Sequence, residues 1–136
     1  MFVPIKDIMT TDVVTVTPDT TIYEALDLLI QRNVSGIPVV NDIKEVVGIL
    51  SEKDVLRILI DRNLDVKKTV YDYMSREVIA FNESDNAIDI CKFFIRSHVR
   101  RVPIVKDGKL VGIISRRDIV KIILEAKSKI DNFRYV

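Results

Sequence analysis

The sequence contains a single cysteine, a single histidine and no tryptophan among its 136 residues. Having only Cys91 excludes an internal disulfide framework and favours a reducing compartment. Having only His98 leaves no histidine and cysteine cluster with the spacing of a metal site. None of the four glycines forms a Walker A loop or a dinucleotide-binding fingerprint. We therefore expect neither a metal site nor catalysis.

Long apolar runs are also absent. No stretch approaches the roughly 18 residues that a membrane span requires, and the first residues lack a basic region followed by an apolar one. The chain is 48% hydrophobic and 30% charged, which suits one compact domain or two very small ones sharing a core. These features predict a soluble, cytoplasmic protein.

Net charge is low but unevenly distributed. Residues 1–65 hold 6 lysines and arginines against 11 acidic residues, whereas residues 66–136 hold 15 against 9. Anion affinity is therefore expected in the second half.

The chain aligns with itself at an offset of 65 residues, which falls to 64 after one extra residue in the first half. The recurring segments are Ile5–Thr10 with Val70–Ser75, Val34–Asp42 with Val99–Asp107, and Val47–Asp54 with Val111–Asp118. Because order and spacing are both preserved, we interpret the chain as two repeats, residues 1–65 and 66–136.

Each repeat has the pattern βαββα. The expected elements are strands 13–16, 37–40 and 46–50 with helices 21–32 and 52–60, then strands 78–81, 102–105 and 110–114 with helices starting at 86 and 116. The final helix is expected to end near residue 127, and residues 61–68 form the connector. One repeat is too small to bury an adequate core. We predict an α+β fold whose two small sheets pack about a pseudo-twofold axis, leaving two clefts between the repeats.

A polar motif, glycine-x-x-serine-x-x-aspartate, occurs in both repeats where a strand leads into a helix. Its serine and aspartate are Ser51 and Asp54 in the first repeat and Ser115 and Asp118 in the second. One interpretation is a helix-capping box. The other is a ligand site, in which the helix start attracts an anion, the carboxylate accepts ribose hydroxyls and the glycine lets the ligand approach closely. The two interpretations are compatible.

The residues before the middle strands differ between the repeats. Arg100 and Arg101 precede one strand, whereas Ser35 and Gly36 precede the other. Guanidinium groups suit phosphate oxygens, so two clefts of this kind would not bind equally. The basic second half also allows a nucleic-acid-binding protein, although aromatic residues are not interleaved among its arginines.

Several other residues have simpler explanations. His98 lacks a partner for acid–base chemistry and is expected at the surface. Cys91 lies on an apolar helix face and is expected to be a buried structural thiol. Met9 and Met74, which repeat, are expected to pack rather than to act.

The doubled aspartate-x-methionine opening, the strand prolines Pro38 and Pro103, and the doubled polar motif together resemble a tandem pair of cystathionine-β-synthase (CBS) domains, a Bateman module. The resemblance extends from about Ile5 to Leu124, leaving no room for an attached enzyme, so a stand-alone pair is expected. It implies a non-catalytic regulatory module that binds AMP, ADP or ATP between the repeats. S-adenosylmethionine is the alternative ligand.

The resemblance also assigns roles. Asp54 and Asp118 would hold the ribose, and Ser51 and Ser115 would lie near the phosphates. Arg100 and Arg101 would approach phosphate in one cleft, and Ser35 and Gly36 in the other. The residues around adenine would be Thr10, Val14 and Val34, and by repetition Ser75, Ile79 and Val99. Asp118 would share a ligand with Thr10 and Val14, and Asp54 with Ser75 and Ile79.

A homodimer and an unidentified regulated protein are the expected partners. The alternatives to sensing are nucleic-acid binding, an enzyme with no recognisable site, and a structural subunit whose clefts stay empty.

Overall fold

The computed structural model describes residues 2–60, 62 and 67–134. Its contacts divide the chain into two compact units. Unit 1 contains residues 1–11, 80–106 and 111–136, and unit 2 contains residues 12–79 and 107–110. Each unit is therefore one sequence repeat completed by segments of the other. The repeat boundary expected between residues 65 and 66 lies outside the described residues.

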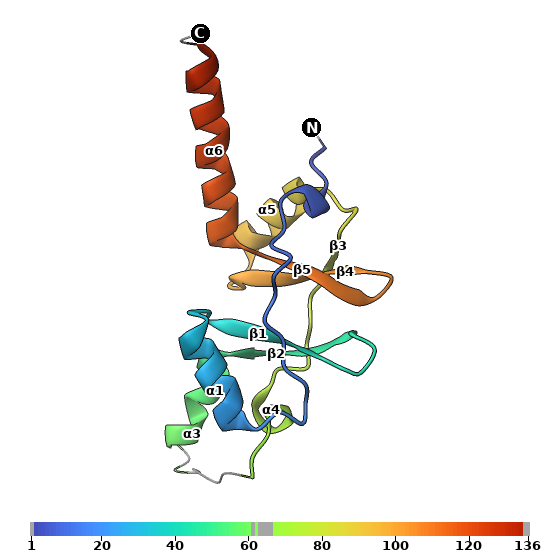
Figure 1. The fold of residues 1–136 in the computed structure, drawn as a ribbon, viewed down its shortest axis with the longest axis vertical. Coiled ribbons are helices and arrows are strands. Elements are labelled where there is room, and N and C mark those ends of the chain that lie inside the picture. The colour runs from blue at the N-terminus through green and yellow to red at the C-terminus, as the bar shows by residue number, and fades with distance from the viewer. Residues whose placement is uncertain (1, 61, 63–66, 135–136) are drawn as a thin grey trace. The chain divides into compact units, whose positions relative to one another are not determined.

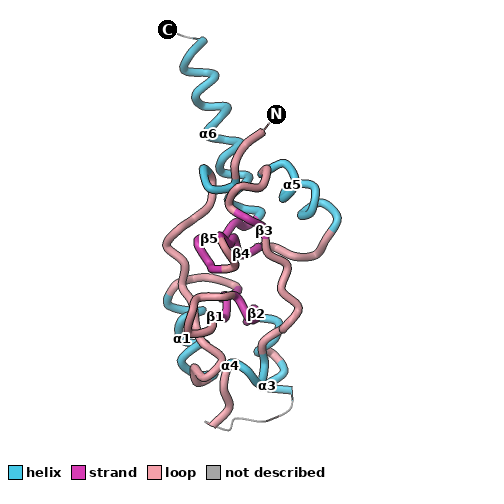
Figure 2. Tube along the Cα trace, turned by 90° about the vertical axis from the view of Figure 1, so that its right-hand side faces the viewer, coloured by secondary structure: helices cyan, strands magenta, loops and turns pink. Residues whose placement is uncertain are grey.

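Unit 2 is built around an antiparallel strand pair. Its elements are α1 (Ile22–Gln31), β1 (Gly36–Val40), β2 (Val46–Ser51), α2 (Glu52–Val55), α3 (Arg57–Ile60) and α4 (Val70–Tyr73). The two strands β1 and β2 are drawn in magenta in Figure 2. Ile37 pairs with Leu50, and the register shifts between Val39 and Val40. The strand expected at residues 13–16 is reduced to Val16, which bridges to Val39 in parallel.

Unit 1 contains a three-stranded sheet in the order β3-β4-β5 (Figure 1). Its elements are the 3₁₀ helix η1 (Ile5–Asp7), β3 (Phe81–Asn82), α5 (Ala87–Arg96), β4 (Arg101–Lys106), β5 (Lys109–Ser115) and α6 (Arg116–Arg134). Between β4 and β5, Asp107 and Gly108 have φ angles of 51° and 79°. Positive φ at both positions matches the type I′ turn that an Asp-Gly sequence predicts.

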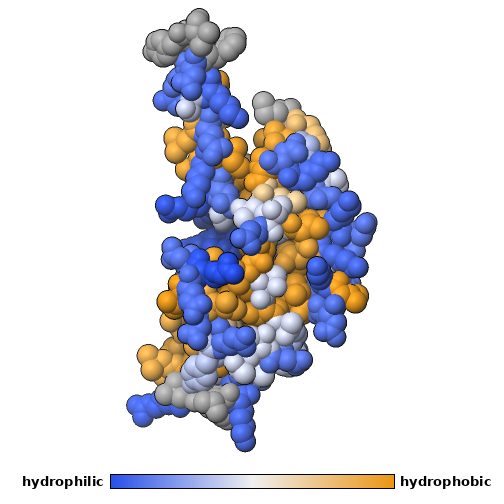
Figure 3. Space-filling model, in the orientation of Figure 1, coloured by the Kyte–Doolittle hydropathy of each residue, from blue (hydrophilic) through white to orange (hydrophobic). Residues whose placement is uncertain are grey.

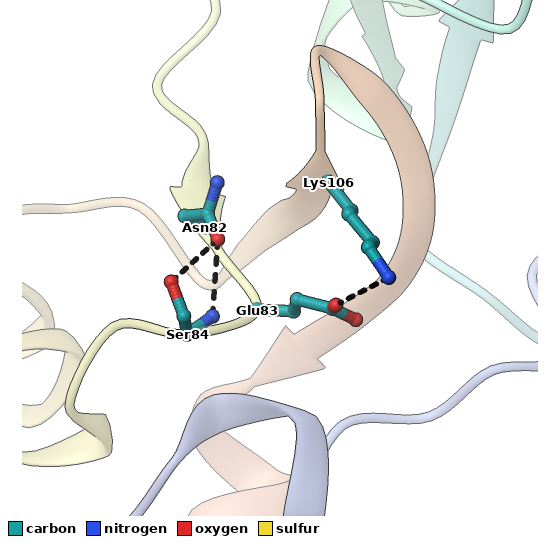
Figure 4. Close-up of polar contacts among 4 residues, drawn as sticks. All are labelled: Asn82, Glu83, Ser84 and Lys106. Atoms are coloured by element: carbon teal, nitrogen blue, oxygen red, sulfur yellow. Dashed lines mark hydrogen bonds and ion pairs between the residues drawn. The ribbon is translucent and has the colours of Figure 1, made fainter.

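The first strand of unit 1 begins later than the sequence indicates, and a side-chain turn follows it directly. Asn82 Oδ1 accepts hydrogen bonds from the Ser84 N–H at 3.1 Å and the Ser84 hydroxyl at 2.8 Å. Glu83, within this turn, forms an ion pair of 3.5 Å with Lys106 (Figure 4). Of the strand expected at residues 78–81, only Phe81 is in β3, which continues to Asn82.

Each unit has its own apolar core. The buried core of unit 2 consists of Val16, Ile22, Ala25, Leu29, Ile37, Val39, Leu50, Ile58, Val70 and Tyr73. That of unit 1 consists of Ile5, Ala87, Ile90, Phe94, Val102, Ile104 and Ile114. Each core contains residues contributed from the opening of the other repeat: Val70 and Tyr73 in unit 2, and Ile5 in unit 1.

These contributed segments are fixed by matching backbone hydrogen bonds. In unit 1, the Ile5 N–H donates to the Asp85 carbonyl at 3.0 Å. In unit 2, the Val70 N–H donates to the Thr20 carbonyl at 2.9 Å. Both segments form a single short helical turn, which has too few residues to show a helical period in the sequence. The exchange explains why the compact units differ from the sequence repeats.

Three further expectations need correction. The helix expected at 52–60 is two short helices that separate at Leu56, and the helix expected to end near 127 continues to Arg134. Cys91 is half-buried rather than buried. None of the described helices combines the length and apolar character of a membrane span.

Candidate functional site

In unit 2, the repeated polar motif forms a complete capping box at the start of α2. The Asp54 N–H donates to Ser51 Oγ at 3.3 Å, and the Ser51 N–H donates to Asp54 Oδ2 at 2.9 Å. The Ser51 hydroxyl lies 3.0 Å from the same carboxylate oxygen. The capping interpretation is therefore confirmed here.

The same geometry recurs in unit 1 at the start of α6. The Asp118 N–H donates to Ser115 Oγ at 3.1 Å, and the Ser115 N–H donates to Asp118 Oδ2 at 2.9 Å. Both residues are only half-buried. A carboxylate has two oxygens and about four acceptor positions, so capping through Oδ2 leaves acceptor capacity for a ligand. Capping and binding remain compatible.

The glycines of the motif have a packing role that the sequence did not indicate. A Cβ at position 48 would lie 2.8 Å from Met74 Sδ, and a Cβ at position 112 would lie 2.6 Å from Met9 Sδ. Each glycine therefore makes room for a methionine of its own unit. The expected approach of a ligand to this backbone stays a prediction. The methionines pack, as expected.

The residues before the middle strands lie beside the helix starts. The Arg116 N–H donates to the Arg100 carbonyl at 2.9 Å in unit 1, and the Glu52 N–H donates to the Ser35 carbonyl at 3.0 Å in unit 2. Gly36 pairs with Ser51 in the strand register. The structure therefore brings these expected phosphate-side residues next to the expected ribose-side residues within each unit.

The opening segments reach the same edges. Thr10 forms an antiparallel bridge with Ile113 in unit 1, and Ser75 forms one with Ile49 in unit 2. Both side chains are exposed. Thr10 thus lies two residues along β5 from Ser115 by its pairing, which places it in the same unit as Asp118.

The expected adenine-side residues have mixed surroundings. Val14 and Val34 are half-buried against the core of unit 2, and Val99 is half-buried against the core of unit 1. Ile79 is 50% exposed. The valines therefore have a packing role in their own units, whereas Ile79 is available for contact.

The two helix starts differ in charge. Unit 1 presents Arg116 and Arg117 there, beside the exposed Arg100 and the half-buried Arg101. Unit 2 presents Glu52 and Lys53 beside Ser35 and Gly36. The positive charge needed for an anion is therefore concentrated in unit 1.

One functional feature escaped the sequence. The Arg116 guanidinium donates to the Val99 carbonyl at 3.0 Å and to the Ser97 carbonyl, although the sequence indicated only a basic surface residue. No spacing rule predicts such a tertiary contact. Among the described residues, no group of three histidine, cysteine, aspartate or glutamate side chains is placed to hold a metal ion, and His98 is exposed.

Comparison with known proteins supports the pattern of repeats. The family model described as "CBS domain" matches twice, at residues 5–61 and 70–125. The protein MJ1225 of Methanocaldococcus jannaschii is 34% identical over 120 residues, which are 88% of this chain and 42% of that protein. The chain thus spans less than half the length of that relative.

Two solved structures are similar over nearly their whole length. The structure of CBSX2 in complex with AMP has a TM-score of 0.82 and 32% identity, and covers 91% of this chain and 98% of its own. The CBS domain pair of MJ0100, in complex with 5′-methylthioadenosine and S-adenosyl-L-methionine, has a TM-score of 0.80 and 27% identity. It covers 93% of this chain and 99% of its own.

Proposed function

Because this chain belongs to the CBS domain family, we propose that it is a regulatory module that binds an adenosyl ligand and catalyses no reaction. The observation that carries the proposal is the arrangement in unit 1. The Asp118 carboxylate, the Ser115 hydroxyl and the arginine-bearing segment at residues 100–101 meet at one helix start. A carboxylate that could accept from a ribose and a segment whose arginines could bind phosphate are thus joined at one helix start.

The ligand we propose is an adenine nucleotide, such as AMP, ADP or ATP. Asp118 would accept hydrogen bonds from the ribose hydroxyls, and Arg100 and Arg101 would neutralise phosphate oxygens. Thr10 and Val99 would border the adenine. The similar pair in CBSX2 binds AMP, which supports this choice of ligand.

Unit 2 would hold a second, weaker phosphate site. Asp54 and Ser51 repeat the ribose side, but Ser35 and Gly36 supply no cation. We propose that this site, bordered by Ser75 and Ile79, favours adenosyl compounds with little negative charge. Such compounds occupy the similar pair of MJ0100.

Isothermal titration calorimetry of the purified chain with AMP, ATP and S-adenosylmethionine tests the proposal. Replacing Asp118 by alanine should weaken AMP at least about tenfold, because about 1.4 kcal/mol of hydrogen bonding is lost. The matched variant Asp54→Ala, which removes the same motif residue from unit 2, should weaken AMP less. Undiminished AMP affinity in Asp118→Ala, or no binding of any of the three ligands to the wild type, would contradict the proposal.

The alternative, nucleic-acid binding, gives a different signature. Its affinity would fall steeply with salt, since each neutralised phosphate releases counterions. The arginines of unit 1 that favour this alternative are the same ones that favour a nucleotide. If calorimetry detects no heat of binding to single-stranded RNA at low salt, the nucleic-acid alternative is excluded and the nucleotide proposal is retained.

We also propose a homodimer, from apolar side chains that are exposed at equivalent positions of both units. The exposed fractions range from 55% to 85%. The pairs are Ile30 with Ile95, Leu56 with Val120, Leu59 with Ile123, and Ile60 with Leu124. Apolar residues interrupt the otherwise hydrophilic surface of α6 (Figure 3). We call these eight residues the repeated apolar patch.

A second copy of the chain fits this patch better than an unrelated protein does. An ordinary interface covers about 800 Å² on each partner, which is more than four side chains in one unit supply. Because the apolar positions are the same in both units, a partner that binds them must present a matching surface to each unit. A second copy does so, since a two-fold interface uses the same patch on both molecules.

A further inference from the structure

Arg116, the first residue of α6, holds the loop at residues 97–100 through three carbonyl groups. Its Nε donates to the Val99 carbonyl at 3.0 Å, and its Nη2 donates to the Ser97 carbonyl. Its backbone N–H donates to the Arg100 carbonyl at 2.9 Å. One residue therefore satisfies three backbone acceptors of the loop that leads into β4.

Two additional contacts strengthen this attachment. The Arg116 guanidinium lies over the ring of Phe94, 6.0 Å from its centroid, within the range of a cation–π interaction. The Val99 N–H donates to Ser97 Oγ at 3.2 Å, which closes the loop on itself. Phe94 is buried in the core of unit 1, so the loop is anchored to the core through the guanidinium.

The described residues of unit 2 show no equivalent of this anchor. The residue at the matching position is Glu52, whose backbone N–H still donates to the Ser35 carbonyl at 3.0 Å. Its ionised carboxylate only accepts hydrogen bonds and so cannot bind carbonyl groups. The side-chain anchor therefore belongs to the unit whose loop carries Arg100 and Arg101, and not to the unit whose loop carries Ser35 and Gly36.

We propose that Arg116 is a positioning residue that orders this loop before the ligand arrives and so makes the unit 1 site selective for phosphate. The inference rests on the proposed function. A loop already held in its bound conformation loses less entropy on binding, which raises affinity without any new contact. Two of its five guanidinium N–H groups already bind carbonyls of this loop, so we assign Arg116 to the loop and the phosphate to Arg100 and Arg101.

The test compares Arg116→Gln and Arg116→Lys with the control Arg117→Gln. Arg117 is the adjacent arginine and is exposed, so its replacement removes the same charge without loosening the loop. Calorimetry with AMP and with adenosine reports selectivity. Arg116→Gln should weaken AMP about tenfold and adenosine less than about threefold, while Arg117→Gln should have a smaller effect on AMP. Arg116→Lys should resemble Arg116→Gln, because lysine keeps the charge but lacks the planar fork.

Hydrogen–deuterium exchange of the ligand-free variants gives a second readout that does not require binding. The amides of residues 98–101 should exchange faster in Arg116→Gln than in the wild type or in Arg117→Gln. Unchanged exchange at this loop would overturn the inference, as would wild-type AMP affinity in Arg116→Gln or full AMP affinity in Arg116→Lys. A wild type that binds neither AMP nor adenosine would instead overturn the proposed function. The exchange experiment is done without ligand, so its result does not depend on that function.

Discussion

Met9 lies against Gly112 so closely that a Cβ on residue 112 would meet Met9 Sδ at 2.6 Å and the Thr10 carbonyl oxygen at 3.0 Å. The equivalent pair, Met74 and Gly48, has distances of 2.8 Å to Sδ and 2.9 Å to the Ser75 carbonyl oxygen. The methionine and the glycine that recur in both repeats therefore contact each other within each unit.

Gly112→Ala should lower the free energy of unfolding by about 1–3 kcal/mol, because the added methyl group overpacks a closed site. Urea denaturation followed by circular dichroism measures the loss. Adding Met9→Ala to this variant should restore part of the lost stability, because the contact with the sulfur disappears. The restoration should be partial, because the contact with the Thr10 carbonyl remains. If the double variant loses as much unfolding free energy as the two single variants lose together, the methionine is not the obstacle.

Ile5→Ala should destabilise the protein by about 2–5 kcal/mol, although it lies near the start of the sequence. The reason is that Ile5 is fully buried in the core of unit 1. Phe2→Ala is the control, because Phe2 is 63% exposed and its loss should change stability by less than about 0.5 kcal/mol. Equal melting temperatures for the two variants would contradict the assignment of this segment to unit 1.

Ser115→Ala should cost about 1 kcal/mol, because the Asp118 N–H loses the acceptor that caps α6. Ser51→Ala should cost a similar amount at the start of α2. The control, Ser128→Ala, replaces an exposed residue inside α6 and should be neutral or slightly stabilising. Thermal unfolding monitored at matched pH distinguishes the three.

Leu59→Glu combined with Ile123→Glu should convert a dimer to a monomer, because charge is placed in both halves of the repeated apolar patch. Analytical ultracentrifugation of the wild type and the double variant measures the mass. Ile43→Glu, which changes an exposed isoleucine outside the patch, should leave the dimer intact. A wild-type chain that sediments as a monomer at tens of micromolar would refute the dimer.

Much of this fold follows from the sequence where local chemistry is strong. The helix expected at residues 21–32 is found at Ile22–Gln31, and Thr21 caps it through a hydrogen bond from the Glu24 N–H. The Asp107-Gly108 turn adopts the positive φ angles that its residue types favour. In each case the signal lies within a few neighbouring residues.

The sequence failed where distant contacts decide the structure. Residues Val13 to Val16 are β-branched and favour a strand, but only Val16 finds a partner, on β1. The short helices η1 and α4 have no period to detect, and they form because each docks on the other repeat's elements. The anchoring of the 97–100 loop by Arg116 depends on residues that only the tertiary fold brings together.

The candidate site shows the same division. Repetition alone identified the serine and aspartate pairs, because their spacing is identical in both repeats. It could not reveal that the motif glycine makes room for a methionine, since an expected ligand would also require the missing Cβ. The recurrence of methionine and glycine together was the available signal.

The exchange of segments between the repeats affects the order in which the protein can form. Residues 3–10 precede the rest of the chain during synthesis, yet their partners Asp85, Asn86 and Ile113 come from the later two-thirds of the sequence. Residues 12–79 hold most of unit 2 and lie together in the sequence. On the ribosome, unit 2 can therefore assemble first. Ile5 and Met9 cannot be buried until the rest of unit 1 has been translated.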